Sequence, residues 1–175
     1  MRSVLGVDVA STSWVANGSA RIEIDDQSFR RVTPAAIRWP SDEYSPSALA
    51  NAIDEHARKH RVIAVSLDGP QGWRDPSTPV GTPGVGRRCE HMCRTQGKAG
   101  QFGVTYPGNQ RAWFEFCTAL FDELLRKPNV VLKNDGAPLP REGYVVLECF
   151  PTSVWRTSGL TALPERANTQ RSRPT

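Results

Sequence analysis

The chain has 175 residues, of which 38% are hydrophobic and 23% are charged, so it fits one domain with a sizeable core. Its net charge of +4 is compatible with a polyanionic partner and does not require one. No apolar segment approaches the length of a membrane span or a secretory leader, which argues against a membrane protein and favours a cytoplasmic one. We therefore expect the four cysteines to be free thiols.

The first part of the chain predicts strands, a helix and a further strand. β-branched and apolar residues favour three strands, at residues 4–9, 15–24 and 29–39. A helix is expected at 45–60, where Ser45 suits the N-cap and Pro46 the first helical position. The apolar strand at 62–67 ends in Asp68, and a helix leading into such a strand implies parallel pairing.

Residues 69–108 form a long segment without periodicity that holds nine of the 14 glycines. A segment this irregular is rare in a compact domain unless it is functional or mobile, although a short helix is expected at 87–95. An amphipathic helix then runs from Asn109 to Pro128, and its core-facing residues are predicted to be Trp113, Phe116, Cys117, Leu120, Leu124 and Leu125.

The chain ends with a fifth strand at 144–148 and a short helix at 151–158. The domain is expected to span residues 1–165, followed by a polar, basic tail at 166–175 that we expect to be disordered. His56 and His60, at the end of the first helix, are interpreted as surface residues that complement the helix dipole.

Three apolar strands end in acidic residues, namely Asp8, Asp68 and Glu148. A single such acid usually forms a turn or caps a helix, but three at the ends of three parallel strands favour a site, because ligands bind at that edge of an α/β sheet. Carboxylates brought close together repel, and a divalent cation offsets the repulsion. The sequence therefore predicts a Mg²⁺ or Mn²⁺ site of the kind that catalyses phosphoryl transfer.

Arginines of the irregular segment are candidates for binding the phosphates of such a substrate, because guanidinium groups hold phosphate bidentately. They are Arg87, Arg88 and Arg94, and the alternative is a solvated basic loop. Cys89, His91 and Cys93 lie close together, but no second pair of ligands accompanies them, so a helix turn is preferred to a zinc site.

The chain resembles the DUF429 family, predicted nucleases with a ribonuclease H-like fold. The similarity rests on four short stretches in order, "GVDVAST", "SLDGPQGW", "RRCEHMCR" and "LECFPTSVWR". It implies an α/β fold with a five-stranded mixed sheet of order 3-2-1-4-5 and helices on both faces. It also implies Asp8, Asp68 and Glu148 as catalytic and metal-binding residues, and Arg88 with Glu90 as a loop pair reaching the site.

The chain departs from that family at its end. Family members continue past the "LP" stretch into further helices, one of which carries another Asp, whereas this chain ends at Thr175. The expectation from the resemblance is therefore a divalent-metal-dependent nuclease or phosphodiesterase acting on nucleic acid or another phosphodiester, without that further acid.

Two other classes remain open. "GVDVAST" also looks like the first phosphate loop of actin-like kinases and ATPases, in which Asp8 would hold Mg²⁺ while Ser11 and Thr12 face the nucleotide phosphates. Those proteins are normally twice this length. A non-catalytic binding or scaffold domain that keeps the same fold is the third class.

Overall fold

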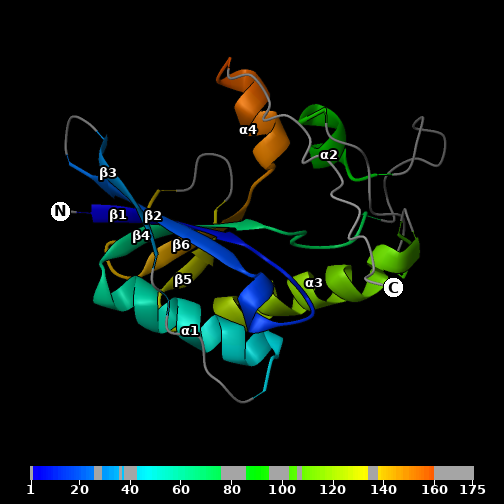
Figure 1. Cartoon of the computed structure of the whole chain (residues 1–175), viewed down its shortest axis with the longest axis horizontal. Helices are drawn as coiled ribbons and strands as arrows, with labels where there is room; N and C mark the ends of the chain where they lie inside the picture. The colour runs from blue at the N-terminus through cyan, green and yellow to red at the C-terminus, as the bar shows by residue number, and fades with distance from the viewer. Residues whose placement is uncertain are drawn as a thin grey trace, which may run out of the picture.

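The protein is an α/β structure built on a six-stranded mixed sheet (Figure 1). The strand order is β3-β2-β1-β4-β6-β5. β1 pairs antiparallel with β2 and parallel with β4, while β6 is parallel to both β4 and β5. The strands are β1 (Arg2–Asp8), β2 (Gly18–Ile24), β3 (Phe29–Pro34), β4 (Val62–Asp68), β5 (Val130–Leu132) and β6 (Tyr144–Glu148). The computed structural model describes residues 2–25, 29–35, 37, 43–75, 86–94, 103–105, 108–133 and 138–159.

The expectation of five strands is wrong by one edge strand. β5 has three residues, which is too short for a period-2 pattern to be recognised in the sequence. The expected strand at 15–24 is also shorter than predicted, because Trp14–Ala16 form a 3-10 helix, η1. β3 ends at Pro34, which has no backbone N–H for a further ladder bond, and residues 38–39 of the expected strand lie outside the described residues.

Helices lie on both sides of the sheet (Figure 1). The two long helices, α1 (Pro46–Lys59) and α3 (Arg111–Leu125), pack together below the sheet in this view. The short helices α2 (Arg88–Met92) and α4 (Pro151–Thr157) lie above it, and a 3-10 turn, η2 (Gly108–Gln110), precedes α3. Ser45 caps α1 as predicted, because its hydroxyl accepts a hydrogen bond from the Ala48 N–H at 3.2 Å.

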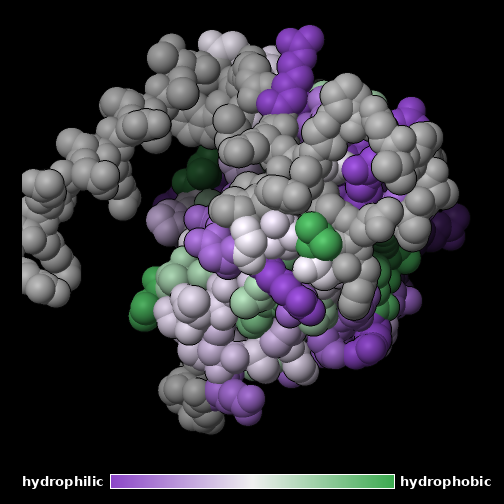
Figure 2. All heavy atoms as spheres, turned by 90° about the vertical axis from the view of Figure 1, so that its right-hand side faces the viewer, coloured by the Kyte–Doolittle hydropathy of each residue, from purple (hydrophilic) through white to green (hydrophobic). Residues whose placement is uncertain are grey.

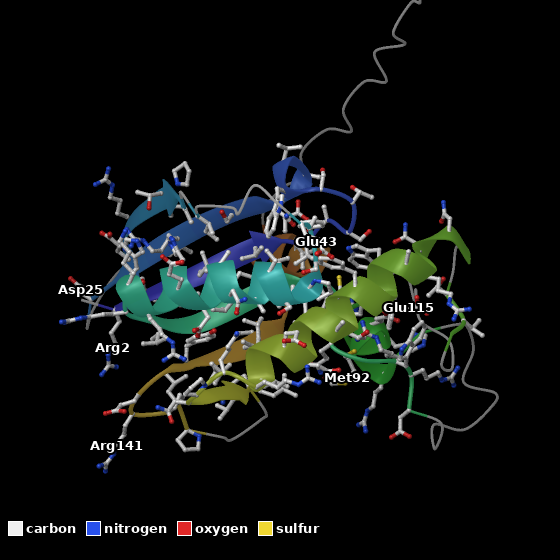
Figure 3. All side chains as sticks on the ribbon, turned by 90° about the horizontal axis from the view of Figure 1, so that it is seen from below. Arg2, Asp25, Glu43, Met92, Glu115 and Arg141 are labelled. Atoms are coloured by element: carbon white, nitrogen blue, oxygen red, sulfur yellow. The ribbon has the colours of Figure 1, made fainter. Side chains whose placement is uncertain are left out.

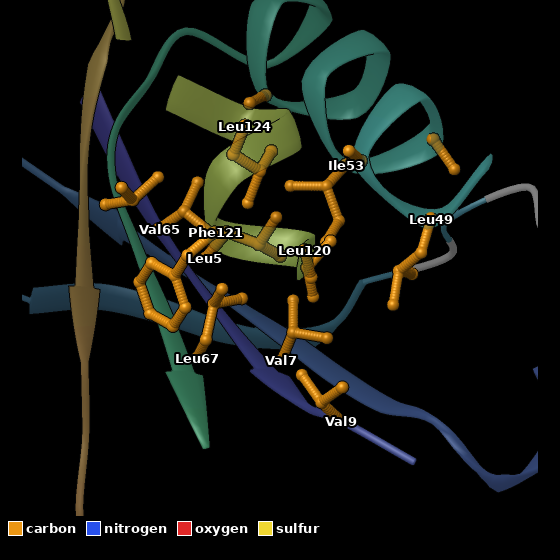
Figure 4. Close-up of a cluster of buried hydrophobic side chains, with 14 of the residues drawn as sticks. Leu5, Val7, Val9, Leu49, Ile53, Val65, Leu67, Leu120, Phe121 and Leu124 are labelled. Carbon is orange, nitrogen blue, oxygen red and sulfur yellow. The ribbon is translucent and has the colours of Figure 1, made fainter. Parts of the chain in front are cut away.

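The hydrophobic core lies between the sheet and the two long helices (Figure 4). Strands β1 and β4 contribute side chains at alternate positions, and the helices contribute one stripe each. The stripe of α3 differs from the prediction, because Phe114 and Phe121 are buried whereas Leu125 is 37% exposed. The labelled core residues are Leu5, Val7, Val9, Leu49, Ile53, Val65, Leu67, Leu120, Phe121 and Leu124.

The described surface carries scattered hydrophobic residues. On the side shown in Figure 2, they form small separate patches between hydrophilic ones. None of the four cysteines forms a disulfide, as predicted. No helix within the described part of the chain has the length and apolar character needed to cross a membrane. The expected disordered tail at 166–175 lies outside the described residues.

Candidate functional site

Asp8 and Asp68 stand side by side at the ends of two neighbouring parallel strands. They are direct partners in the register of β1 and β4, and neighbouring strands lie about 4.8 Å apart. The preceding residues, Val7 and Leu67, point into the core, so the alternation of strand side chains directs both carboxylates to the opposite face.

The two aspartates line one pocket of about 400 Å³, formed between this face of the sheet and the start of α4. Small side chains keep the pocket open. Gly18 is the partner of Asp8 on β2, and a Cβ added there would lie 3.4 Å from the Asp8 Cβ and 3.8 Å from its Oδ2. The other lining residues are Gly6, Val7, Ser19, Ala20, Ser66, Cys149 and Pro151.

The turn after Asp8 is held by one nearby side chain, Asn17, and by two from distant parts of the chain, Tyr44 and Trp113. Trp113 Nε1 donates to the Val9 carbonyl oxygen at 2.8 Å, and the Ala10 N–H donates to Asn17 Oδ1 at 2.9 Å. The Tyr44 hydroxyl donates to the Ala10 carbonyl oxygen. These three bonds satisfy the backbone polar groups at the end of β1, and they fix the position from which the Asp8 side chain projects.

Glu148 does not join the two aspartates, which corrects the expected three-acid cluster. In the register of β4 and β6, Glu148 is the partner of Leu67, so its side chain lies on the face opposite to Asp68. The residue that reaches the acid pocket from this strand is the next one, Cys149, whose N–H donates to the Leu67 carbonyl oxygen at 2.9 Å.

Glu148 is instead bound by Arg87. The two side chains form a bidentate pair, with Arg87 Nη2 2.5 Å from Glu148 Oε1 and Nη1 2.8 Å from Oε2. Glu148 Oε2 also accepts the Gln71 N–H at 3.1 Å. The Glu148 side chain is only 7% exposed, so the ion pair is largely shielded from solvent.

Arg87 uses all five of its guanidinium N–H groups within the protein. Besides the two bonds to Glu148, Nε and Nη2 donate to Glu90 Oε1 and Nη1 donates to the Gly72 carbonyl oxygen. A guanidinium has five donors, so none remains for a phosphate. The prediction that Arg87 binds substrate is therefore wrong, because this arginine serves two buried carboxylates.

The surroundings of Arg87 keep it charged. Burial alone lowers the pKa of Arg87, but the hydrogen bonds and the charge of Glu148 outweigh burial and raise it above its ordinary value. Its guanidinium also lies over the Phe114 ring, 5.5 Å from the centroid. Arg88 and Glu90, expected together as a loop pair reaching the site, are separated in the structure: Glu90 pairs with Arg87, whereas Arg88 is exposed.

The remaining predicted residues lie outside the lining of the acid pocket. Arg88 begins α2, and Arg94 follows this helix with a positive φ of 52°. Ser11 and Thr12 lie in the turn after β1, where Ser11 is half-buried and Thr12 is exposed. The predicted phosphate-binding residues are thus not gathered around Asp8 and Asp68 in the described residues.

Cys149 and Ser66 also line this pocket, and neither was predicted from the sequence. Burial raises the pKa of the Cys149 thiol, a hydrogen bond with Ser66 lowers it, and the carboxylate charges nearby raise it further. The net shift is upward, which favours the protonated thiol at neutral pH over the nucleophilic thiolate. Counting alternate positions back from Asp68 finds Ser66, whereas Cys149 needs the pairing of β4 with β6.

The two aspartates fit one mode of metal binding. Mg²⁺ is often held by one or two carboxylates together with water and substrate phosphates, and two adjacent carboxylates beside an open pocket match that donor set. In the described part of the chain, no group of three or more His, Cys, Asp or Glu side chains is placed to hold a metal ion. That statement includes Cys89, His91 and Cys93.

Comparisons with protein-family models, with curated proteins and with solved structures each gave no match.

Proposed function

We propose that this protein is a divalent-metal-dependent phosphodiesterase, with a nucleic acid as the preferred substrate class. The observation that carries the proposal is the pairing of Asp8 with Asp68 at the ends of two parallel strands, on one face and in one pocket. Ligand sites of open α/β sheets lie at this edge. Two carboxylates this close repel each other, and a bound cation removes the repulsion.

Each described residue of the pocket then has a physical role. Asp8 is exposed and Asp68 half-buried, so the pair would hold Mg²⁺ or Mn²⁺ with open positions toward solvent. When bound, such an ion supplies charge stabilisation at a phosphoryl group and lowers the pKa of water. Gly18 leaves room beside Asp8, and the protonated Cys149 thiol adds no further negative charge.

The order of the strands supports the proposal that the fold is ribonuclease H-like. Without the short edge strand β5, the sheet reads β3-β2-β1-β4-β6, which is the order that the resemblance to the DUF429 family implies. Membership of that family is likewise a proposal, and it rests on the motifs around Asp8 and Asp68. In this proposal Glu148 orients the loop through Arg87 and is not a metal ligand.

The test is cleavage of a panel of labelled single-stranded and double-stranded DNA, RNA and RNA–DNA hybrid, with Mg²⁺, Mn²⁺ or a chelator. We expect metal-dependent cleavage that Asp8→Asn reduces by about 100-fold or more, since even residues supporting a metal ligand contribute 10- to 100-fold. The matched control is Asp122→Asn, an exposed aspartate of α3, which should cleave normally. Equal cleavage by both variants, or none by the Mn²⁺-loaded protein, would contradict the proposal.

Two other results would favour the alternative classes. If ATP with Mg²⁺ raises the melting temperature and Asp8→Asn removes that effect, without any cleavage, the actin-like nucleotide-binding class is favoured. If Asp8→Asn and Asp68→Asn both raise stability and metal has no effect on the wild-type protein, the pair is a strained part of a scaffold domain.

A further inference from the structure

A second pocket, of about 560 Å³, lies at the opposite end of the sheet. It is formed where β1, β4 and β6 begin and where α1 ends. β1 separates the two pockets, since its seven residues span about 20 Å at roughly 3.3 Å per residue. Figure 3 shows Arg2 and Arg141 at this same end of the sheet. The lining residues are Arg2, Ala57, Arg58, Arg61, Val62, Ile63, Arg141, Glu142, Gly143 and Tyr144.

The lining is strongly positive. It contains four arginines and one glutamate, so the formal net charge of the lining side chains is +3. Arg58 is engaged, because it donates to Asp54 Oδ2 at 2.9 Å and to the Pro128 carbonyl oxygen at 2.8 Å. The other three are Arg2, Arg61 and Arg141, and their side chains make no ion pair or hydrogen bond with any described residue.

Two of these arginines, Arg61 and Arg141, lie in or next to turns with a left-handed backbone conformation. Arg61, between α1 and β4, has a φ of 50°, a region that favours glycine. After Arg141, Gly143 has a φ of 81°, and a Cβ there would lie 2.0 Å from the Asn129 carbonyl oxygen. The turn that carries Arg141 is therefore packed directly against the Asn129 backbone.

The C-terminal end of α1 repels a bound anion only weakly. The C-terminus of a helix carries a partial negative charge of about half an electron, which is small beside the charge of the arginines. Asp54 also lies near, but it accepts hydrogen bonds from both Arg58 and the Tyr144 hydroxyl, the latter at 2.9 Å. The pocket therefore retains its positive character.

We propose that this pocket binds an anion with several phosphate groups, either as free polyphosphate or as the triphosphate of a nucleotide. Guanidinium groups bind phosphate oxygens bidentately, and three arginines that form no ion pair with a described residue suit a ligand with several negative charges. The volume lies within the range of small-molecule sites, about 300–1,000 Å³. The site is separate from the acid pocket and does not depend on the proposed phosphodiesterase activity.

The experiment titrates inorganic tripolyphosphate and ATP into the full chain by calorimetry, without divalent metal and at constant ionic strength. We expect saturable binding that the double variant Arg2→Ala/Arg141→Ala weakens at least about tenfold. Arg111→Ala, which removes an arginine of α3 outside the pocket, and Asp8→Asn should both bind normally. Equal affinity for the two probes assigns recognition to the phosphate chain, and tighter binding of ATP adds a contact with its nucleoside.

Arg61→Gly separates a binding role from a structural one. Glycine suits the left-handed backbone, so this variant should keep or raise the melting temperature and yet bind tripolyphosphate more weakly. The proposal would be overturned if neither tripolyphosphate nor ATP binds, or if the double variant binds them with unchanged affinity. It would also be overturned if an oligonucleotide alone binds in a way that depends on these arginines.

Discussion

Gly69, directly after Asp68, allows the end of β4 to meet α3. A Cβ built on Gly69 would lie 2.7 Å from Cys117 Sγ and 3.2 Å from Cys117 Cβ. Cys117 is buried on α3, so it has little room to move away. The absence of a side chain at one residue thus sets how closely the helix approaches the strand end that carries an acid of the candidate site.

Gly69→Ala should destabilise the protein by about 1–3 kcal/mol, because the new methyl group overpacks this contact. Urea unfolding measures the change. Cys117→Ala in the same chain should recover part of the loss attributed to the Gly69 substitution, since it removes the nearer atom. Gly72→Ala is the matched control, because a Cβ there meets no atom within 4 Å. Equal losses for Gly69→Ala and Gly72→Ala would contradict this view of the contact.

At the scale of elements, Arg87 joins α2 to the end of β6. Its backbone N–H donates to Glu90 Oε2 at 2.8 Å, and its side chain bridges Glu90 and Glu148. Glu90 is 2% exposed, Arg87 7% exposed and the Glu148 side chain 7% exposed, so the ion pairs that Arg87 makes with both carboxylates are buried. α2 has only five residues, and this buried contact holds it against the sheet.

Arg87→Ala should cost about 3–5 kcal/mol, because it removes the bidentate cation of the buried Glu148 carboxylate and an ion-pair partner of Glu90. Arg88→Ala, at the next and exposed position, should change stability by less than about 0.5 kcal/mol. Chemical denaturation without metal compares the two variants. If Arg87→Ala costs as little as Arg88→Ala, the pairing of Arg87 with Glu148 is not a stabilising contact.

At the scale of the whole molecule, we expect stability to depend on pH through a histidine whose position was predicted wrongly. His56 was expected on the surface, but it is buried on α1, and its Nε2 has no hydrogen-bond partner among the described residues. Its ring lies 4.4 Å from that of His60. Burial, followed by the charges of His60, Arg21 and Lys59, lowers the pKa of His56 from 6.5 to about 4.

The unfolded chain therefore takes up a proton at His56 at a higher pH than the folded protein does. The contribution of neutral His56 to the free energy of unfolding is therefore fully present above pH 6.5 and is lost as the pH falls from 6.5 to 4. Below pH 4 the loss is complete and no longer changes with pH. His56→Gln should flatten the dependence of unfolding free energy on pH in this interval. His91→Gln, at an exposed histidine, should retain it. Parallel curves for wild type and His56→Gln would show that His56 does not carry the effect.

Local signals explain how much of the architecture was predictable. Ser45 and Pro46 define the start of α1 through their own capping chemistry, and the apolar runs before Asp8 and Asp68 define β1 and β4. β5 was not predicted, because its three residues are too few to show the alternating pattern of a strand. Leu125 was wrongly assigned to the core because the buried stripe of α3 is set by its packing on α1.

The sequence by itself determined most of the strands and helices, though not β5, and it placed Asp8, Asp68 and Glu148 at strand ends, since these features depend on neighbours in the chain. Only the tertiary structure decided which side chains share a face. The register of β4 with β6 turns Glu148 toward Arg87 and Cys149 toward the aspartates, because a shift of one residue reverses the face. The arginine pocket likewise exists only in the folded molecule, since its residues come from separate segments whose ends the sheet brings together.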